Sequence, residues 1–130
     1  MLLPTTLCLA AAAALVNIWL VLRIGRLRTQ YKVSVGDGGH ELLGRRMRAQ
    51  LNFAENVPVV VILVGLIEFT GKGGLWLSIV AAVFMLGRLL HAFGMDGDTP
   101  YKGRMIGTAT AMLTQIGLAA VAVLLAARVI

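Results

Sequence analysis

The chain is poor in cysteine, in aromatic residues and in charge. Cys8 is its single cysteine, so a disulfide within the chain is excluded, and no metal-ligand residue types neighbour it in the sequence. Charged residues make up 14% of the 130 residues and aromatic residues 6%, whereas hydrophobic residues make up 58%. Soluble domains carry about 25% charged residues. The composition therefore indicates a membrane protein, and Cys8 is interpreted as a small apolar residue within a span.

Long apolar runs predict an all-α membrane protein. Each run is close to the ~20 residues that cross ~30 Å of hydrocarbon as a helix. We expect four transmembrane helices at about residues 2–22, 42–69, 75–93 and 105–127. The first run is expected to be a retained span, since basic residues follow it instead of preceding it as in a secretory signal. Because little chain is left outside the membrane, residues 1–130 are predicted to form a single four-helix integral membrane domain.

The basic residues indicate a membrane topology rather than a nucleic-acid partner. They outnumber the acidic residues by 12 to 6 and lie next to the expected spans, without the interleaved aromatic residues of a nucleic-acid surface. Most of them fall between the first two helices or between the last two: Arg23, Arg26, Arg28, Lys32, Arg45, Arg46, Arg48, Lys102 and Arg104. Because positively charged segments stay in the cytoplasm, both termini are expected outside and these segments inside.

The connections between helices are expected to be exposed. The first is expected to run from about residue 23 to 48. Glu68 stands four residues before Lys72, a spacing that favours an exposed ion pair. Asp96 and Asp98 are interpreted as part of a solvated turn. The first and fourth helices are rich in small residues, so we expect them to pack against each other within or between subunits.

One face of the second helix is polar although the helix is otherwise apolar. At about 100 degrees per residue, this face collects Glu41, Arg45, Arg48, Asn52, Glu55 and Asn56. A membrane helix with one polar stripe lines a site, a pore or an interface. A pore is not favoured, because the stripe stops at Asn56 and the helix is almost wholly apolar from there to Ile67.

Polar residues of the last two helices are expected at the same depth. The second helix enters the membrane where the third leaves it, which places Arg88, His91 and Arg104 near the stripe. Glu55 is expected to pair with Arg88 or Arg48, because an unpaired charge in a membrane is costly. Such pairs could simply hold helices together. The arginines outnumber Glu55, however, and arginine binds carboxylates, glutamate an ammonium group and asparagine an amide. This favours a site for a small peptide-like anion.

These residues resemble a known family. Residues 48–58, the segment Arg88-Leu89-Leu90-His91 and Arg104 are similar to MAPEG, the membrane-associated proteins in eicosanoid and glutathione metabolism. Residues 27–33 and 36–39 are similar to its small bacterial members, and the resemblance covers nearly the whole chain. It implies a homotrimer of four-helix subunits in a bacterial inner membrane. Glutathione is then the co-substrate, bound between subunits near the cytoplasmic surface without a metal.

The resemblance also implies roles for single residues. Arg104 is the candidate catalytic residue, because a guanidinium close to the glutathione sulfur favours the thiolate. The candidate glutathione-binding residues are Arg48, Asn52, Glu55, Asn56, Arg88, His91, Arg26 and Arg28. Eicosanoid-forming relatives have a tyrosine where this chain has Met95, and one branch has a serine where it has Met105. These departures do not favour prostaglandin isomerisation.

Two functions fit this pattern. In the first, the protein is a glutathione transferase or peroxidase that acts on lipophilic electrophiles by thiolate stabilisation. In the second, it is a non-catalytic membrane binding or scaffold protein whose pocket takes another anion, such as a lipid headgroup. The expected partners are copies of the chain, membrane lipids and lipophilic small molecules, with no nucleic acid.

Overall fold

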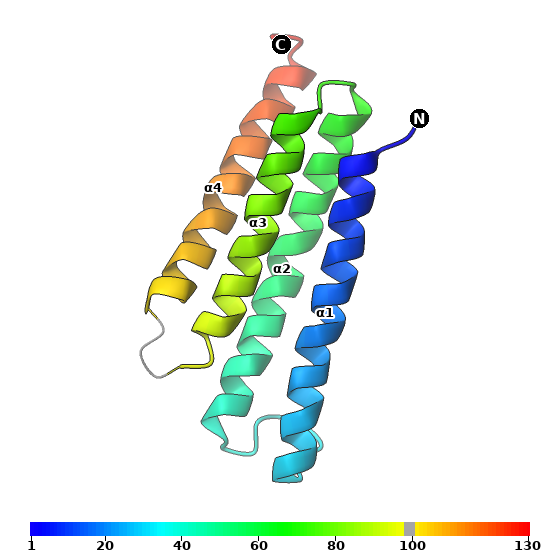
Figure 1. Ribbon diagram of the computed structural model, residues 1–130. Helices are drawn as coiled ribbons and strands as arrows, with labels where there is room; N and C mark the ends of the chain where they lie inside the picture. Colours follow the sequence, from blue (N-terminus) through cyan, green and yellow to red (C-terminus); the bar gives the residue numbers. More distant parts are fainter. Residues whose placement is uncertain (98–100) are drawn as a thin grey trace.

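The computed structural model describes residues 1–97 and 101–130, which form a bundle of long helices (Figure 1). The helices are α1 Pro4–Tyr31, α2 Glu41–Phe69, α3 Leu75–Gly94 and α4 Tyr101–Ala126. Four helices are long and apolar enough to cross a membrane. The predicted all-α membrane architecture is therefore confirmed.

Two helices begin or end outside the apolar runs that predicted them. α1 continues to Tyr31 instead of ending near residue 22, so its arginines lie on a helix and the first connection is only residues 32–40. Residues 23–31 are mostly good helix formers. The helix ends at Lys32, which adopts the left-handed conformation with φ of 57° and donates its backbone N–H to the carbonyl of Arg28. α4 begins at Tyr101 rather than at residue 105.

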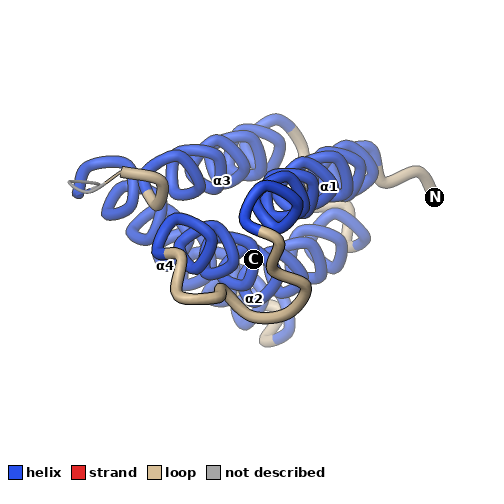
Figure 2. The backbone as a smooth tube through the Cα atoms, turned by 90° about the horizontal axis from the view of Figure 1, so that it is seen from below, coloured by secondary structure: helices blue, strands red, loops and turns tan. Residues whose placement is uncertain are grey.

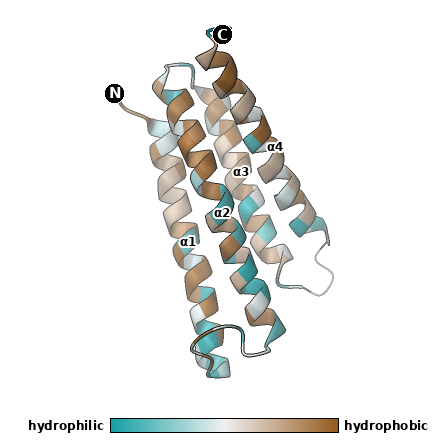
Figure 3. Cartoon of the chain, turned by 180° about the vertical axis from the view of Figure 1, so that it is seen from behind, coloured by the Kyte–Doolittle hydropathy of each residue, from teal (hydrophilic) through white to brown (hydrophobic). Residues whose placement is uncertain are grey.

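The helix order places the basic segments together. Both termini and the α2–α3 turn lie at one end of the bundle, and the α1–α2 connection, the end of α3 and the start of α4 lie toward the other (Figure 1). Hydrophilic residues gather toward this second end, whereas the opposite half of α2 and α3 is mostly hydrophobic (Figure 3). The polar residues of the bundle are therefore concentrated toward this end.

The helices lie side by side in one bundle, which Figure 2 shows from below. α1 contacts α2 and α3, and α4 contacts the same two helices, but no contact joins α1 to α4 within the described part of the chain. The expected packing of the first helix on the fourth is thus wrong within one chain. Between subunits it stays a prediction.

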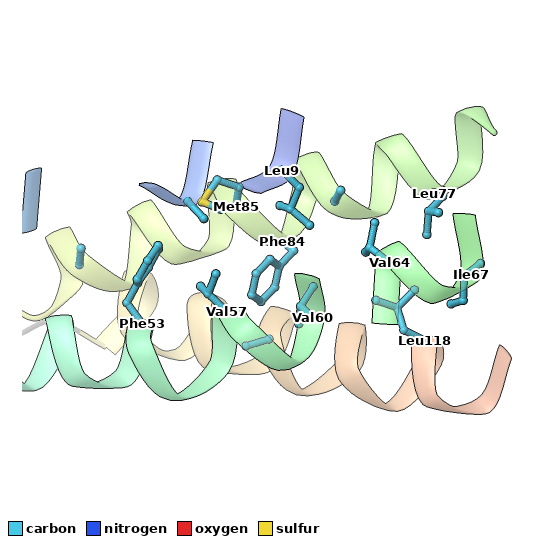
Figure 4. Close-up of a cluster of buried hydrophobic side chains, with 14 of the residues drawn as sticks. Leu9, Phe53, Val57, Val60, Val64, Ile67, Leu77, Phe84, Met85 and Leu118 are labelled. Carbon is cyan, nitrogen blue, oxygen red and sulfur yellow. The ribbon is translucent and has the colours of Figure 1, made fainter. Parts of the chain in front are cut away.

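The core is a column of apolar side chains contributed by all four helices (Figure 4). Phe84 of α3 is fully buried, as are Val60 and Val64 of α2 and Leu118 of α4. Many large apolar side chains on all four helices remain exposed, as expected for helices that face lipid. This core packs the four helices against one another.

Glycines let α3 and α4 approach each other closely. A Cβ atom on Gly107 would lie 2.5 Å from Cβ of His91 and 2.6 Å from the carbonyl oxygen of Gly87. A Cβ on Gly94 would likewise overlap the backbone nitrogen of Arg104. Small residues at such contacts allow helix backbones to pack in lipid. The start of α4, with Arg104, is therefore seated directly on the end of α3.

Glu68 caps α1 rather than pairing with Lys72. Its carboxylate accepts hydrogen bonds from the backbone N–H groups of Thr5, at 2.9 Å, and Thr6, at 2.8 Å, and from the Thr6 hydroxyl at 2.6 Å. The first N–H groups of a helix have no partner within it and attract negative charge. The expected Glu68–Lys72 pair is wrong, since the structure gives these two residues no ion pair where both are described.

Candidate functional site

A polar cleft of about 270 Å³ opens between α2, α3 and α4. It is lined by Arg48, Leu51, Asn52, Glu55, His91, Met95, Arg104 and Thr108. Residues from α2 recur at helical spacing and form one wall, and Arg104 and Thr108 lie one turn apart on the opposite helix. The structure therefore brings together five of the predicted site residues from three helices.

Three residues of the lining were not predicted as site residues. Leu51, Met95 and Thr108 lie among the charged side chains of the cleft. Thr108 follows Arg104 by four residues, so helical periodicity alone could have placed it on the same face. Its hydroxyl adds a hydrogen-bond donor and acceptor beside the arginine.

The charges in the cleft are unpaired. Arg48, Glu55 and Arg104 are all exposed. No ion pair or hydrogen bond of their side chains is found among residues 1–97 and 101–130. The expected pairing of Glu55 with Arg88 or Arg48 is therefore not formed within the chain, and across subunits it stays a prediction. Two guanidinium groups and one carboxylate are left facing a common space.

Arg88 lies behind the cleft instead of lining it. Its side chain is buried, and it donates hydrogen bonds to Oδ1 of Asn52 and to the backbone carbonyl of Gly107. Arg88 thereby joins the two walls of the cleft from α3. Because Oδ1 of Asn52 is occupied, the amide Nδ2 of Asn52 is the group available as a donor to a ligand.

Asn56 is also outside the cleft. Its Nδ2 donates to the carbonyl of Asn52 at 2.8 Å, and its Oδ1 accepts a hydrogen bond from Nε2 of Gln115 at 2.7 Å. Gln115 lies on α4, so the amide pair joins α2 to α4 one turn deeper in the bundle. The structure gives Asn56 a role in helix packing, which its place in the polar stripe did not indicate.

A second and larger cleft of about 840 Å³ lies beside the first. Both are bordered by Arg48, Leu51 and Met95, and the larger cleft is also lined by Ile24, Arg28 and Met47. Arg28 donates to the carbonyl of Gly36 at 2.7 Å and so holds the α1–α2 connection. Arg26 is exposed on α1 and lines neither cleft. Neither Arg26 nor Arg28 thus lies at the polar cleft of the same chain.

Asp96 is anchored and is not part of a solvated turn. Arg23 of α1 donates to its Oδ2, and Nε of Arg46 on α2 lies 3.3 Å from its Oδ1. The neighbouring carbonyl of Gly97 accepts a hydrogen bond from Arg45 at 2.9 Å. The interpretation of Asp96 as solvated is therefore wrong, and Asp98 lies outside the described residues.

Comparisons with known proteins agree with the resemblance. The chain is 36% identical over 69 residues to "Inner membrane protein YecN" of Escherichia coli strain K12, and the match covers 53% of this chain and 53% of that protein. The same values hold for the protein of that name in Escherichia coli O6:H1. The match thus spans about half the length of these curated relatives. The model of the MAPEG family matches residues 6–124. That match covers most of the four-helix bundle and the whole cleft, and the chain therefore belongs to the MAPEG family.

Proposed function

We propose that the protein binds glutathione in the cleft between α2, α3 and α4 and activates its thiol for reaction with lipophilic electrophiles. The observation that carries the proposal is the unpaired set of Arg48, Glu55 and Arg104 in one cleft. Charged groups within a membrane are costly unless a partner, a ligand or water meets them. The family includes glutathione transferases and peroxidases, which fits a ligand of this kind.

The free groups of the cleft match the groups of glutathione in sign. Arg48 suits a carboxylate, which a guanidinium binds in a two-pronged fork. Glu55 suits the ammonium group, and Nδ2 of Asn52 suits a peptide carbonyl. Arg104 then remains for the sulfur. The second carboxylate of glutathione needs a further cation, and Arg26 on α1 of a neighbouring subunit would supply it.

The proposed chemistry depends on Arg104. A guanidinium beside a thiol stabilises the thiolate, which is the nucleophilic form. In a transferase reaction the sulfur forms a bond to an electrophilic carbon, and the leaving group departs with its electron pair. In a peroxidase reaction the sulfur of one glutathione attacks the O–O bond of the hydroperoxide, which breaks to give an alcohol and a glutathione sulfenic acid. The thiol of a second glutathione then displaces water from the sulfenic acid and forms the disulfide. Lipophilic substrates would arrive from the bilayer beside the cleft.

A second copy of the chain would complete the site. The cleft of about 270 Å³ in one chain is smaller than most small-molecule pockets, which hold roughly 300–1,000 Å³. Its charged side chains are exposed, and much of the apolar surface of α1 and α4 is uncovered. We propose the homotrimer that the family resemblance implies. We also propose a bacterial inner-membrane location with the termini outside and the cleft near the cytoplasmic face.

The proposal is tested with the purified protein in detergent. Calorimetry should show saturable glutathione binding, and an assay with a chlorinated aryl compound should show glutathione-dependent conjugation. Arg104→Ala should keep most of the binding but lose conjugation by about a hundredfold, the scale of removing one charge-stabilising donor. Lys102→Ala is the matched control, because Lys102 is an exposed cation on the same helix outside the cleft.

Two results would contradict this function. Conjugation at the wild-type rate by Arg104→Ala would remove Arg104 from the chemistry. Absence of heat and of thermal stabilisation with millimolar glutathione, while an anionic phospholipid gives both, would favour the non-catalytic binding protein instead.

A further inference from the structure

Asp96 is clamped by arginines from two other helices at the point where α3 ends. Arg23 of α1 and Arg46 of α2 bind its two carboxylate oxygens. The side chains of Arg23, Arg46 and Asp96 are 11%, 21% and 27% exposed. An ion pair shielded to this degree holds its geometry better than one on an open surface. The cluster therefore fixes the first residues of the α3–α4 connection to α1 and α2.

Arg23 is itself held in one orientation. Its guanidinium carbon lies 4.6 Å from the centre of the Trp19 ring and 5.8 Å from that of Phe93, and the two rings are 5.2 Å apart. Its Nη1 atom is buried without a hydrogen-bond partner in the described ranges. A guanidinium confined between aromatic rings needs a nearby counter-charge. Asp96 is that counter-charge, so its loss would release the whole cluster.

Asp96 lies two residues after Gly94, which packs against the backbone of Arg104. Met95, directly before Asp96, lines the polar cleft together with Arg104. Gly94 precedes Met95, and the backbone of Arg104 lies so close to it that a Cβ on Gly94 would overlap the Arg104 nitrogen. The backbone at the end of α3 is thus packed directly against the backbone at the start of α4.

We propose that Asp96 is a positioning residue for the cleft: by bridging Arg23 and Arg46 it fixes the end of α3 and, through the Gly94–Arg104 backbone contact, holds Arg104 in place. The effect on the thiol rests on the proposed function. The mechanical effect on α4 stands on the geometry alone.

Electrostatics and positioning predict opposite results when the charge of Asp96 is removed. Loss of a carboxylate near the cleft makes the site more positive, which favours a thiolate and lowers the pKa of a bound thiol. Release of Arg104 from its position weakens the stabilisation of the thiolate and raises that pKa. The direction of the change therefore separates a positioning role from a purely electrostatic one.

The test uses the full chain in detergent and the variant Asp96→Asn. The matched control is Asp37→Asn, which removes a charge at the same end of the bundle. Oδ1 of Asp37 accepts a hydrogen bond from the backbone N–H of Gly39 at 3.0 Å, and the side-chain oxygen of an asparagine can accept the same hydrogen bond. Hydrogen exchange should speed up in residues 103–107 of Asp96→Asn but not in the control. Ultraviolet titration of bound glutathione should show a raised thiol pKa and about tenfold less thiolate at neutral pH.

Each outcome decides one statement. Unchanged exchange in residues 103–107 of Asp96→Asn overturns the positioning role, as does a thiol pKa that is equal to or below that of the wild-type protein. If wild-type protein binds no glutathione, the proposed function fails, and the exchange measurement alone still decides whether Asp96 holds the start of α4.

Discussion

Arg88 supports Asn52 from behind the cleft, where its guanidinium donates to Oδ1 of Asn52 and to the carbonyl of Gly107. One side chain of α3 thereby ties the α2 wall of the cleft to the α4 wall. Arg88 is itself buried and does not line the cleft. The effect of Arg88 on a ligand is therefore expected to pass through Asn52.

This relationship predicts a non-additive result for glutathione binding. Arg88→Met and Asn52→Ala should each weaken binding by about tenfold, the scale of one lost polar contact. The double variant should also bind glutathione about tenfold more weakly than the wild-type protein, and no more weakly than either single variant, because Arg88 acts only through Asn52. Calorimetry on the three variants measures the coupling, and melting curves check that each is folded. Additive losses of about a hundredfold would show that Arg88 contacts the ligand itself.

Glu55 is predicted to recognise the ammonium group of glutathione. Glu55→Gln should weaken glutathione binding by about tenfold, since hydrogen bonds to charged groups contribute roughly 1.5–3 kcal/mol. Glutathione acetylated on its amine should bind weakly to the wild-type protein and equally weakly to the variant. Glu41→Gln is the control, because Glu41 pairs with Arg45 at 2.5 Å and lies outside the polar cleft. Equal loss of affinity for both ligands in Glu55→Gln would argue against this contact.

Glu68 is predicted to stabilise the fold through α1. Glu68→Gln leaves only a neutral oxygen for the N–H groups of Thr5 and Thr6, and helix caps contribute about 1 kcal/mol. The melting temperature in detergent should fall, whereas Lys72→Ala should leave it unchanged. A fall of the same size in Lys72→Ala would restore the ion pair that the sequence spacing suggested.

Gly107 is predicted to tolerate no side chain. In Gly107→Ala the new Cβ would meet Cβ of His91 at 2.5 Å and the carbonyl of Gly87 at 2.6 Å, which forces α3 and α4 apart. Both the melting temperature and glutathione affinity should fall. Gly117→Ala on the same helix is the control, since a Cβ there would meet no atom within 4 Å, and alanine favours helices by about 1 kcal/mol. Equal melting temperatures for Gly107→Ala and Gly117→Ala would contradict the close packing of α3 against α4.

The fold could be predicted because it follows from local patterns. Apolar runs of membrane-spanning length and the polar stripe on one helix are readable from spacing alone. Arg48, Asn52 and Glu55 share a cleft wall for this reason, and the return of the third helix brought His91 to the same level. The limits of α1 were missed because apolar composition marks where the membrane ends, whereas Lys32 is where the helix ends.

The rest depends on contacts between residues far apart in the chain. Asp96 pairs with Arg23, and Glu68 accepts a hydrogen bond from Thr5, only when the helices are packed together. Spacing within one segment carries no signal for such pairs. Spacing also did not reveal the helix contacts of Arg88 and Asn56, since a polar residue at the right depth can face a neighbouring helix as well as a ligand. A lone glutamine on α4, Gln115, was the available hint that Asn56 had a partner there.

Arg104 is the residue on which the proposed function depends, as the group that stabilises the thiolate of glutathione in the polar cleft. The decisive experiment titrates bound glutathione with pH and follows the ultraviolet absorbance of the thiolate in the wild-type protein and in Arg104→Ala. We predict a thiol pKa below that of free glutathione in the wild-type protein and a return to the free value in Arg104→Ala, with glutathione still bound. The same pKa in both proteins would contradict this role of Arg104.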